Sequence, residues 1–203
     1  MRKLIIFCLF FILCMVFVTR ETMSIIDKSD RVKLKKEFSS YSEALLLTVT
    51  QLGENTKCYH SSVSGPNNEL RGCHDFFHAL VNNLNKTKHC YGKALEHGCV
   101  PIYQKYTDDP KCVGFSEKMI NNYAPVFILN DRSSLIVYKT LDGLIHPIFA
   151  VDVNGKMEPN KPGYDLFSFV IIKNENNDFY LHPHITFCLP PEKGGINNIH
   201  DLD

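Results

Sequence analysis

The chain contains no tryptophan and no excess of charge of either sign. Its 203 residues include 22 Lys and Arg and 22 Asp and Glu, so the formal net charge is zero. A neutral chain offers no electrostatic attraction to nucleic acid, and we expect none among its partners. Catalytic signatures are also missing: no Gly-x-Ser-x-Gly, P-loop, paired-glycine nucleotide motif or His-Glu-x-x-His occurs. We therefore expect a protein that is not an enzyme.

Helix-breaking residues are missing from the start of the chain, where no glycine precedes Gly53 and no proline precedes Pro66. Within this stretch Leu4 to Val18 is an unbroken apolar run, preceded by Arg2 and Lys3. The positive flank predicts a cytoplasmic N-terminus, with the remainder of the chain beyond the membrane. The run is short for a spanning helix and also suits the core of a signal peptide. Of these two interpretations we favour a retained membrane anchor.

The predicted organisation is an anchor or signal segment over residues 1–24 and one extracytoplasmic domain over residues 25–203. This organisation predicts a single-pass protein of the cell membrane whose C-terminal domain is periplasmic or extracellular. Residues 25–53 are expected to continue the anchor as a helix, because apolar residues recur there at helical spacing. They are Leu34, Phe38, Tyr41, Leu45, Val49 and Leu52. This stripe could pack on its own domain or, in part, against neighbouring helices of a filament. The tail, residues 190–203, is expected to be loose.

Six cysteines lie in the exported part: Cys58, Cys73, Cys90, Cys99, Cys112 and Cys188. An even number in an oxidising compartment predicts disulfides, although six cysteines allow about 15 pairings and the sequence does not choose among them. A sequential guess is Cys58–Cys73, Cys90–Cys99 and Cys112–Cys188. Two alternatives use the same region. Neighbouring histidines such as His74 and His78 could join cysteines in a zinc site, or a reduced cysteine beside a histidine could act as a nucleophile. Both alternatives need free thiols, so we favour disulfides.

The rest of the chain changes character once along its length. Cys73 to Leu84 has helical spacing, whereas residues 134–140, 145–153, 166–172 and 179–182 read as strands between turn signals. Helices followed by an antiparallel meander predict one α+β domain.

An oxygen-rich segment separates two of these strands. Asp152, Asn154, Asn160 and Asp165, with nearby backbone carbonyls, could supply the hard oxygen ligands that calcium prefers. However, Lys156 stands where a calcium loop would have a third ligand. The structural alternative is that the Asx side chains hydrogen-bond their own backbone while Pro and Gly shape the turn. We favour the structural interpretation, and calcium is the cofactor that the alternative implies for this segment.

Residues 125–172 resemble the type IV pilin and type II secretion pseudopilin superfamily, in its prepilin-like branch. The resemblance rests on the turn Phe127-Ile128-Leu129-Asn130-Asp131, a following strand and a hairpin motif. The motif consists of Val151, Asp152, Val153, Asn154, Gly155, Pro159, Asn160, Gly163, Asp165 and Phe167. It implies an α+β, pilin-like fold stabilised by disulfides, in which a long N-terminal helix packs on a small antiparallel sheet of three or four strands.

The resemblance also implies a function, that of a minor pilin or pseudopilin that acts through helix-mediated assembly. The implied partners are other pilin or pseudopilin subunits, the membrane machinery of a secretion or pilus system, and membrane lipid around the N-terminal helix. The chain departs from the family at its start, where a Gly-Phe-Thr-Leu-x-Glu junction is lacking and no acidic residue precedes Glu21. This departure leaves an alternative, a membrane-anchored binding module with a pilin-like fold that does or does not bind calcium.

Overall fold

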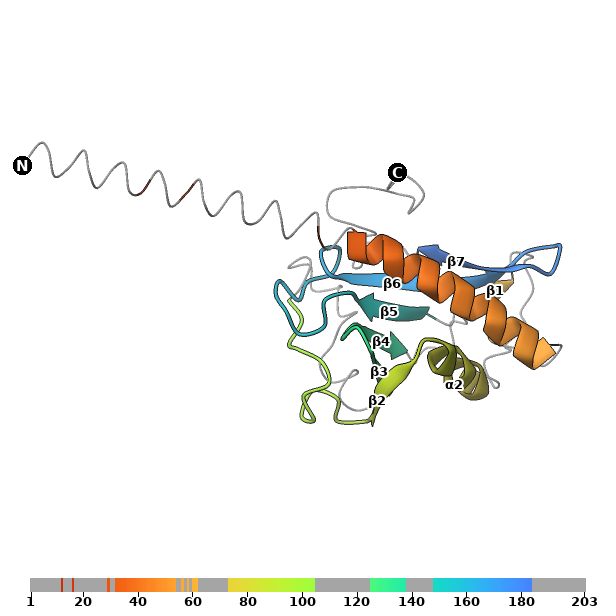
Figure 1. Cartoon of the computed structure of the whole chain (residues 1–203), viewed down its shortest axis with the longest axis horizontal. Coiled ribbons are helices and arrows are strands. Elements are labelled where there is room, and N and C mark those ends of the chain that lie inside the picture. Colours follow the sequence, from red (N-terminus) through yellow and green to blue (C-terminus); the bar gives the residue numbers. More distant parts are fainter. Residues whose placement is uncertain are drawn as a thin grey trace, which may run out of the picture.

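The structure is a computed structural model that describes residues 12, 16, 29, 32–53, 56, 58, 60–61, 73–104, 125–137 and 148–183. Figure 1 shows a twisted sheet with two helices across one face. One helix covers residues 32–52 and the other is α2, Cys73–Asn83. The strands are β1 (His60–Ser61), β2 (Lys86–Tyr91), β3 (Pro125–Leu129), β4 (Ser134–Val137), β5 (Ile148–Asp152), β6 (Leu166–Lys173) and β7 (Phe179–Pro183).

The seven strands form one sheet in the order β1-β6-β5-β4-β3-β2, with β7 also paired to β6. All pairs are antiparallel except the short β1, which runs parallel to β6. Two tight connections shape the sheet, residues 130–133 between β3 and β4 and residues 174–178 between β6 and β7. Each contains a residue at positive φ, Arg132 and Asn177 respectively.

Side chains on the central strands alternate between two buried layers, as the period of two of a strand requires. On β3, Phe127 faces the helices while Val126 faces the opposite side. On β5, Phe149 contacts both helices, through Tyr41 at 5.9 Å and Phe77 at 6.0 Å between ring centroids. Both faces of the middle of the sheet are therefore covered.

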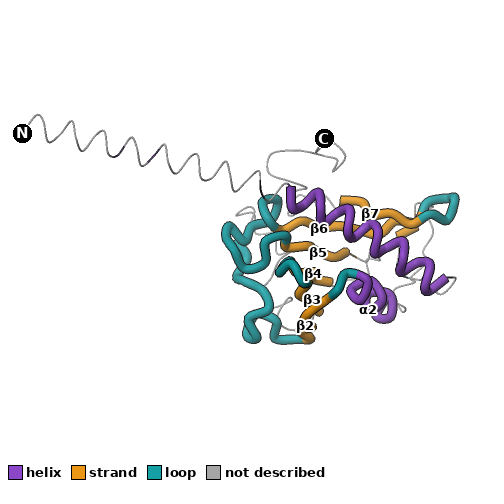
Figure 2. The backbone as a smooth tube through the Cα atoms, in the orientation of Figure 1, coloured by secondary structure: helices purple, strands orange, loops and turns teal. Residues whose placement is uncertain are grey.

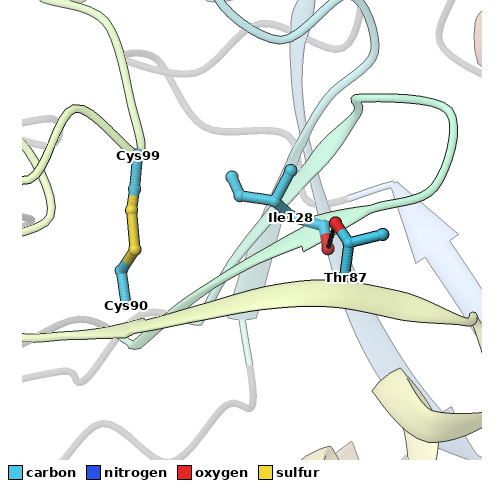
Figure 3. Close-up of a disulfide and its surroundings, with 4 residues drawn as sticks. All are labelled: Thr87, Cys90, Cys99 and Ile128. Atoms are coloured by element: carbon cyan, nitrogen blue, oxygen red, sulfur yellow. Dashed lines mark hydrogen bonds between the residues drawn. A yellow bond between two sulfur atoms is a disulfide. The ribbon is translucent and has the colours of Figure 1, made fainter.

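Residues 92–104 cover the face of the sheet that lies opposite the helices. Their apolar side chains join the smaller buried cluster, which includes Val100, Tyr103 and Leu166. A disulfide from Cys90 on β2 to Cys99 ties this segment to the sheet edge, and Thr87 Oγ1 donates to the Ile128 carbonyl across the β2–β3 pair (Figure 3). Residues 92–104 are thus attached to the sheet both by the disulfide and by their apolar side chains.

The predicted pilin-like fold, a long N-terminal helix on a sheet of three or four strands, is wrong. The described part of the chain is mainly sheet, with six antiparallel strands and the parallel β1, and its helices cover only residues 32–52 and 73–83. The size of the sheet was underestimated because β2 reads Lys-Thr-Lys-His-Cys-Tyr, and within Lys86 to Cys90 only Cys90 is buried. An edge strand of this kind is held by its backbone ladder to β3, so no apolar pattern marks it.

Several other predictions fall largely on residues that the structure does not describe. Of the predicted anchor, residues 1–24, only Ile12 and Val16 are described, and the tail from 190 to 203 lies outside. Across the described ranges, no helix combines the length and the apolar character needed to span a membrane. Cys58–Cys73 and Cys90–Cys99, the first two pairs of the sequential assignment, are present as disulfides, whereas Cys112 and Cys188 lie outside the described residues.

Candidate functional site

The connection between β5 and β6, residues 153–165, is closed at its base by the sheet itself. Asp152, the last residue of β5, pairs with Leu166, the first of β6. The next backbone pair continues the closure, since Val153 N donates to the Asp165 carbonyl at 2.9 Å. Gly155, Asn160 and Gly163 adopt positive φ, which glycine and asparagine tolerate best. The chain therefore folds back on itself within the loop, and Figure 2 shows this loop and residues 92–104 at the same end of the sheet.

The carboxylate of Asp165 organises the second half of the loop. It is completely buried and accepts hydrogen bonds from two successive backbone amides, Asn160 N at 2.6 Å and Lys161 N at 2.7 Å. A third donor, Asn154 Nδ2, lies 3.3 Å from its Oδ2 atom. By accepting these bonds, the carboxylate satisfies two backbone N–H groups of the loop, so Asp165 holds the second half of the loop in its conformation.

Asp152 is the second fully buried carboxyl group of the site. Its Oδ2 accepts a 2.7 Å hydrogen bond from the Tyr103 hydroxyl, and its Oδ1 accepts from Asn154 N at 3.3 Å. Tyr103 belongs to the segment on the face opposite the helices, so this bond joins that segment to the end of β5.

The electrostatics of the two carboxyl groups are set mainly by burial. Loss of water raises the pKa of Asp152 to about 8; the nearby charge of Asp165 also raises it, and the Tyr103 hydrogen bond lowers it. Burial raises the pKa of Asp165 as well, against the opposing effect of the Lys161 and Asn160 amides. Near neutral pH the site therefore favours a proton on Asp152, since a protonated acid avoids placing two negative charges side by side without water.

The four oxygen-bearing residues singled out in the sequence are brought together here. Besides the two carboxyl groups, the amide oxygens Oδ1 of Asn154 and Asn160 are buried and have no hydrogen-bond partner. Lys156 and Glu158, in contrast, have exposed side chains. The buried arrangement presents two carboxyl groups and two amide oxygens, a donor set suited to a hard cation.

Two neighbouring segments brace the loop from outside. Gln104 donates from its backbone N to the Asn160 carbonyl at 2.7 Å and from its Nε2 to the Pro159 carbonyl at 2.9 Å. On the other side Gly155 lies so close to the β3–β4 turn that a Cβ atom would overlap the carbonyl oxygen of Arg132. Glycine at 155 is thus required by both its φ of 68° and this contact.

A second buried acidic group lies beside the β3–β4 turn. Glu37 of helix 32–52 is only 5% exposed and hydrogen-bonds to Asp131. Burial, followed by the bond to Asp131 and the charge of Asp131, raises the pKa of Glu37 to about 8. Although burial alone would raise the pKa of Asp131, hydrogen bonds from Glu37 and Ser133 lower it overall. Burial also raises the pKa of Tyr41, which feels Glu37, Asp131 and Asp152, so it lies between the two acidic sites.

A pocket of about 370 Å³ opens beside this second group. It lies between helix 32–52, the turn after α2 and the β3–β4 turn, and its lining includes Lys36, Glu37, Glu43, Asn85 and Asp131. The pocket gives the Glu37 carboxyl group a route to water although the side chain itself is buried.

Among the residues that the structure describes, His and Cys side chains do not form the zinc site that was considered as an alternative. Cys73, Cys90 and Cys99 are all consumed by disulfides. His78 and His89 do approach each other, with ring centroids 5.6 Å apart, but His89 stacks on the Phe127 ring and His78 meets that ring edge-on. Within the described ranges no three His, Cys, Asp or Glu side chains are grouped so as to hold a metal ion.

Sequence reasoning missed two buried residues, Glu37 and Tyr103, and did not identify the exposed Asp131 as the partner of Glu37. A signal existed for Glu37, because it stands three residues after Leu34 and four before Tyr41, on the apolar face of the helix. No comparable signal marks Tyr103, which meets Asp152 from 49 residues away along the chain.

No protein-family model, curated protein or solved structure matches the chain. The family resemblance of residues 125–172 therefore stays a prediction from the sequence.

Proposed function

We propose that the protein is a non-enzymatic subunit of a type II secretion or type IV pilus assembly, equivalent to a minor pilin or pseudopilin. It acts by packing its N-terminal helix against other pilin or pseudopilin subunits and the membrane machinery, and lipid surrounds the segment that precedes the domain. The proposal concerns function and does not depend on the small pilin-like sheet that the structure excludes.

The observation that carries this proposal is the exposure of three large apolar side chains on helix 32–52, which stand among the Lys, Ser, Glu and Thr residues that form most of its outer side. Val32, Leu46 and Leu47 are 70%, 66% and 47% exposed. At about 3.6 residues per turn they lie on the side opposite the buried Leu34 and Tyr41. A helix that is apolar toward its sheet and also carries large apolar residues outward has a second surface available for another subunit.

The experiment measures self-association of the full chain by sedimentation in a mild detergent. Leu46→Glu combined with Leu47→Glu is expected to weaken association at least about tenfold, because burying each leucine contributes about 1.5–3 kcal/mol. The control is Ile102→Glu with Met157→Glu, which places the same two charges on exposed apolar positions outside the helix. A parent chain that stays monomeric, or a leucine variant that associates like the control, would contradict the proposal.

The maturation of the N-terminus offers an independent test of the pilus or secretion pathway. Mass spectrometry of the protein from its native membrane should reveal cleavage near Arg2 or Lys3 and a methylated new N-terminus. An intact Met1 would instead point to a plain signal anchor, and a start at Ile25 would point to a cleaved signal peptide.

A second candidate function is an exported binding module that takes calcium, and one specific observation favours it. Two buried carboxyl groups, Asp152 and Asp165, share a loop with the unpartnered Oδ1 atoms of Asn154 and Asn160. A calcium ion would coordinate these oxygens and would neutralise both carboxylates. Without a cation, burial of two ionised carboxylates side by side is unfavourable.

Calorimetric titration of the full chain with calcium tests this candidate. We expect heat of binding from the parent chain and its loss in Asn160→Gly, which removes one amide oxygen while glycine retains the positive φ of 49°. Asp152→Ala should abolish binding as well. Asn177→Gly is the matched control, since Asn177 has a φ of 67° in the exposed β6–β7 turn. Absence of heat in the parent chain would leave only the structural role of the loop.

A further inference from the structure

Glu37 occupies a position where the packing of helix 32–52 calls for an apolar side chain. It lies on the buried face together with Leu34 and Tyr41, and is 5% exposed. An ionised carboxylate at such a place costs several kcal/mol unless it is paired, so its partner determines its chemical state.

Its partner is another carboxyl group, that of Asp131 in the β3–β4 turn, which lines the same pocket as Glu37. Two carboxyl groups can hydrogen-bond only if one of them carries a proton. Ser133 donates to Asp131 Oδ1 twice, from its backbone N at 3.0 Å and its hydroxyl at 2.7 Å. These donors favour the ionised form of Asp131, so the shared proton resides on Glu37.

We propose that a single proton, shared between Glu37 and Asp131, latches helix 32–52 to the β3–β4 turn, and that loss of this proton releases the helix from the turn. The latch is a pH-sensitive contact between the helix and the sheet. It does not require that the protein assemble with other subunits, and it would operate equally in a monomeric binding module.

The groups that face Glu37 come from two elements. Lys33 and Lys36 on its own helix favour ionisation of Glu37, whereas Asp131 on the β3–β4 turn opposes it. Tyr41, which is also influenced by Glu37 and Asp131, links the latch electrostatically to Asp152 on β5. Lys36 and Glu43 line the adjoining pocket, through which the proton can leave without unfolding of the helix.

The direction of the effect follows from the raised pKa of Glu37, about 8 against an ordinary value of 4.5. At pH values between about 4.5 and about 8, Glu37 is protonated in the folded chain and ionised in the unfolded chain, so folding takes up a proton. The contribution of Glu37 to stability therefore falls as the pH rises through this range. Above about 8 the folded protein also loses the proton, and two negative charges then face each other across the contact. The raised pKa values of Asp152 and Asp165 also make the free energy of unfolding fall with rising pH. The effect of Glu37 is therefore separated from theirs by comparing variants.

The first measurement is the carbon NMR titration of the Glu37 carboxyl group in the full chain. We expect a midpoint near 8 in the parent and a lower midpoint in Asp131→Asn, because the negative partner is removed. A parent midpoint close to 4.5 would overturn the proposal.

The second measurement is hydrogen exchange of the backbone amides in helix 32–52 at pH 7 and pH 9, after correction for intrinsic exchange. Protection in the parent should fall at least tenfold at the higher pH. Glu37→Gln cannot ionise and can still donate to Asp131, so its protection should change little. Glu175→Gln, which changes an exposed acidic residue in the β6–β7 turn away from the latch and its pocket, is the control and should behave like the parent. An equal loss of protection in the parent and in Glu37→Gln would overturn the latch.

Discussion

The two buried acidic groups of this protein solve the same physical problem in different ways. In the β5–β6 loop, Asp165 is surrounded by N–H donors from residues four, five and eleven positions away. At the helix, Glu37 meets another carboxyl group that lies more than ninety residues away along the chain. A carboxylate supplied with local N–H donors shapes its own loop, whereas a carboxyl pair holds two distant elements together only while it retains a proton.

The largest effect is expected when the local donors lose their acceptor. Asp165→Ala leaves the buried amides of Asn160 and Lys161 without partners and should lower the free energy of unfolding by about 4 kcal/mol. Urea unfolding measures this loss. Asp178→Ala, in the exposed β6–β7 turn, should cost no more than about 0.5 kcal/mol. Similar losses in the two variants would show that Asp165 does not hold the loop in its conformation.

A smaller loss in the free energy of unfolding is expected when the contact between the β5–β6 loop and the β3–β4 turn is disturbed. Gly155→Ala combines backbone strain with overlap on the Arg132 carbonyl and should cost about 3 kcal/mol. Gly92 has the same φ of 68° but no atom within 4 Å of an added Cβ. Gly92→Ala should therefore show the strain alone, about 1 kcal/mol. Equal losses on thermal unfolding would remove the argument for a close contact.

The smallest effect concerns the single hydroxyl donor of Asp152. Tyr103→Phe should lower the free energy of unfolding by about 1.5 kcal/mol, because the buried oxygen loses its hydrogen bond. The loss should be greater at pH 9 than at pH 6, since the Tyr103 hydroxyl stabilises the ionised form that Asp152 adopts above its pKa of about 8. Urea unfolding at both values provides the measurement, and a loss independent of pH would mean that the bond does not favour the carboxylate.

The sequence allowed more of the local structure to be predicted than of the sheet. Helical spacing over Cys73 to Leu84 predicted α2, and the apolar run from Leu166 predicted β6; both are confirmed. The predicted number of strands was too small because β1 is only two residues long and β2 is polar, so neither has a hydrophobic pattern. Their pairing is decided by backbone groups on the neighbouring strands, which no local pattern reveals.

The same distinction between local and long-range features applies to the candidate sites. Asp152, Asn154, Asn160 and Asp165 could be selected in advance because they are close in sequence and occur in a turn-forming context. The loop brings them together through hydrogen bonds of short range, as the structural interpretation requires. The partners of Asp152 and Glu37 could not be selected, since Tyr103 and Asp131 reach them only through the sheet.

The sequence by itself determined the features that depend on neighbouring residues, namely the helical stripe and the oxygen-rich loop. It predicted disulfides without fixing their pairing, and the fold selected Cys58–Cys73 and Cys90–Cys99. Only the tertiary structure decided the seven-stranded sheet, the bond from Tyr103 to Asp152 and the contact of Glu37 with Asp131. The physical reason is range, because turn geometry and side-chain periodicity are set within a few residues, whereas strand pairing and burial of charge depend on segments that meet only when the chain is folded.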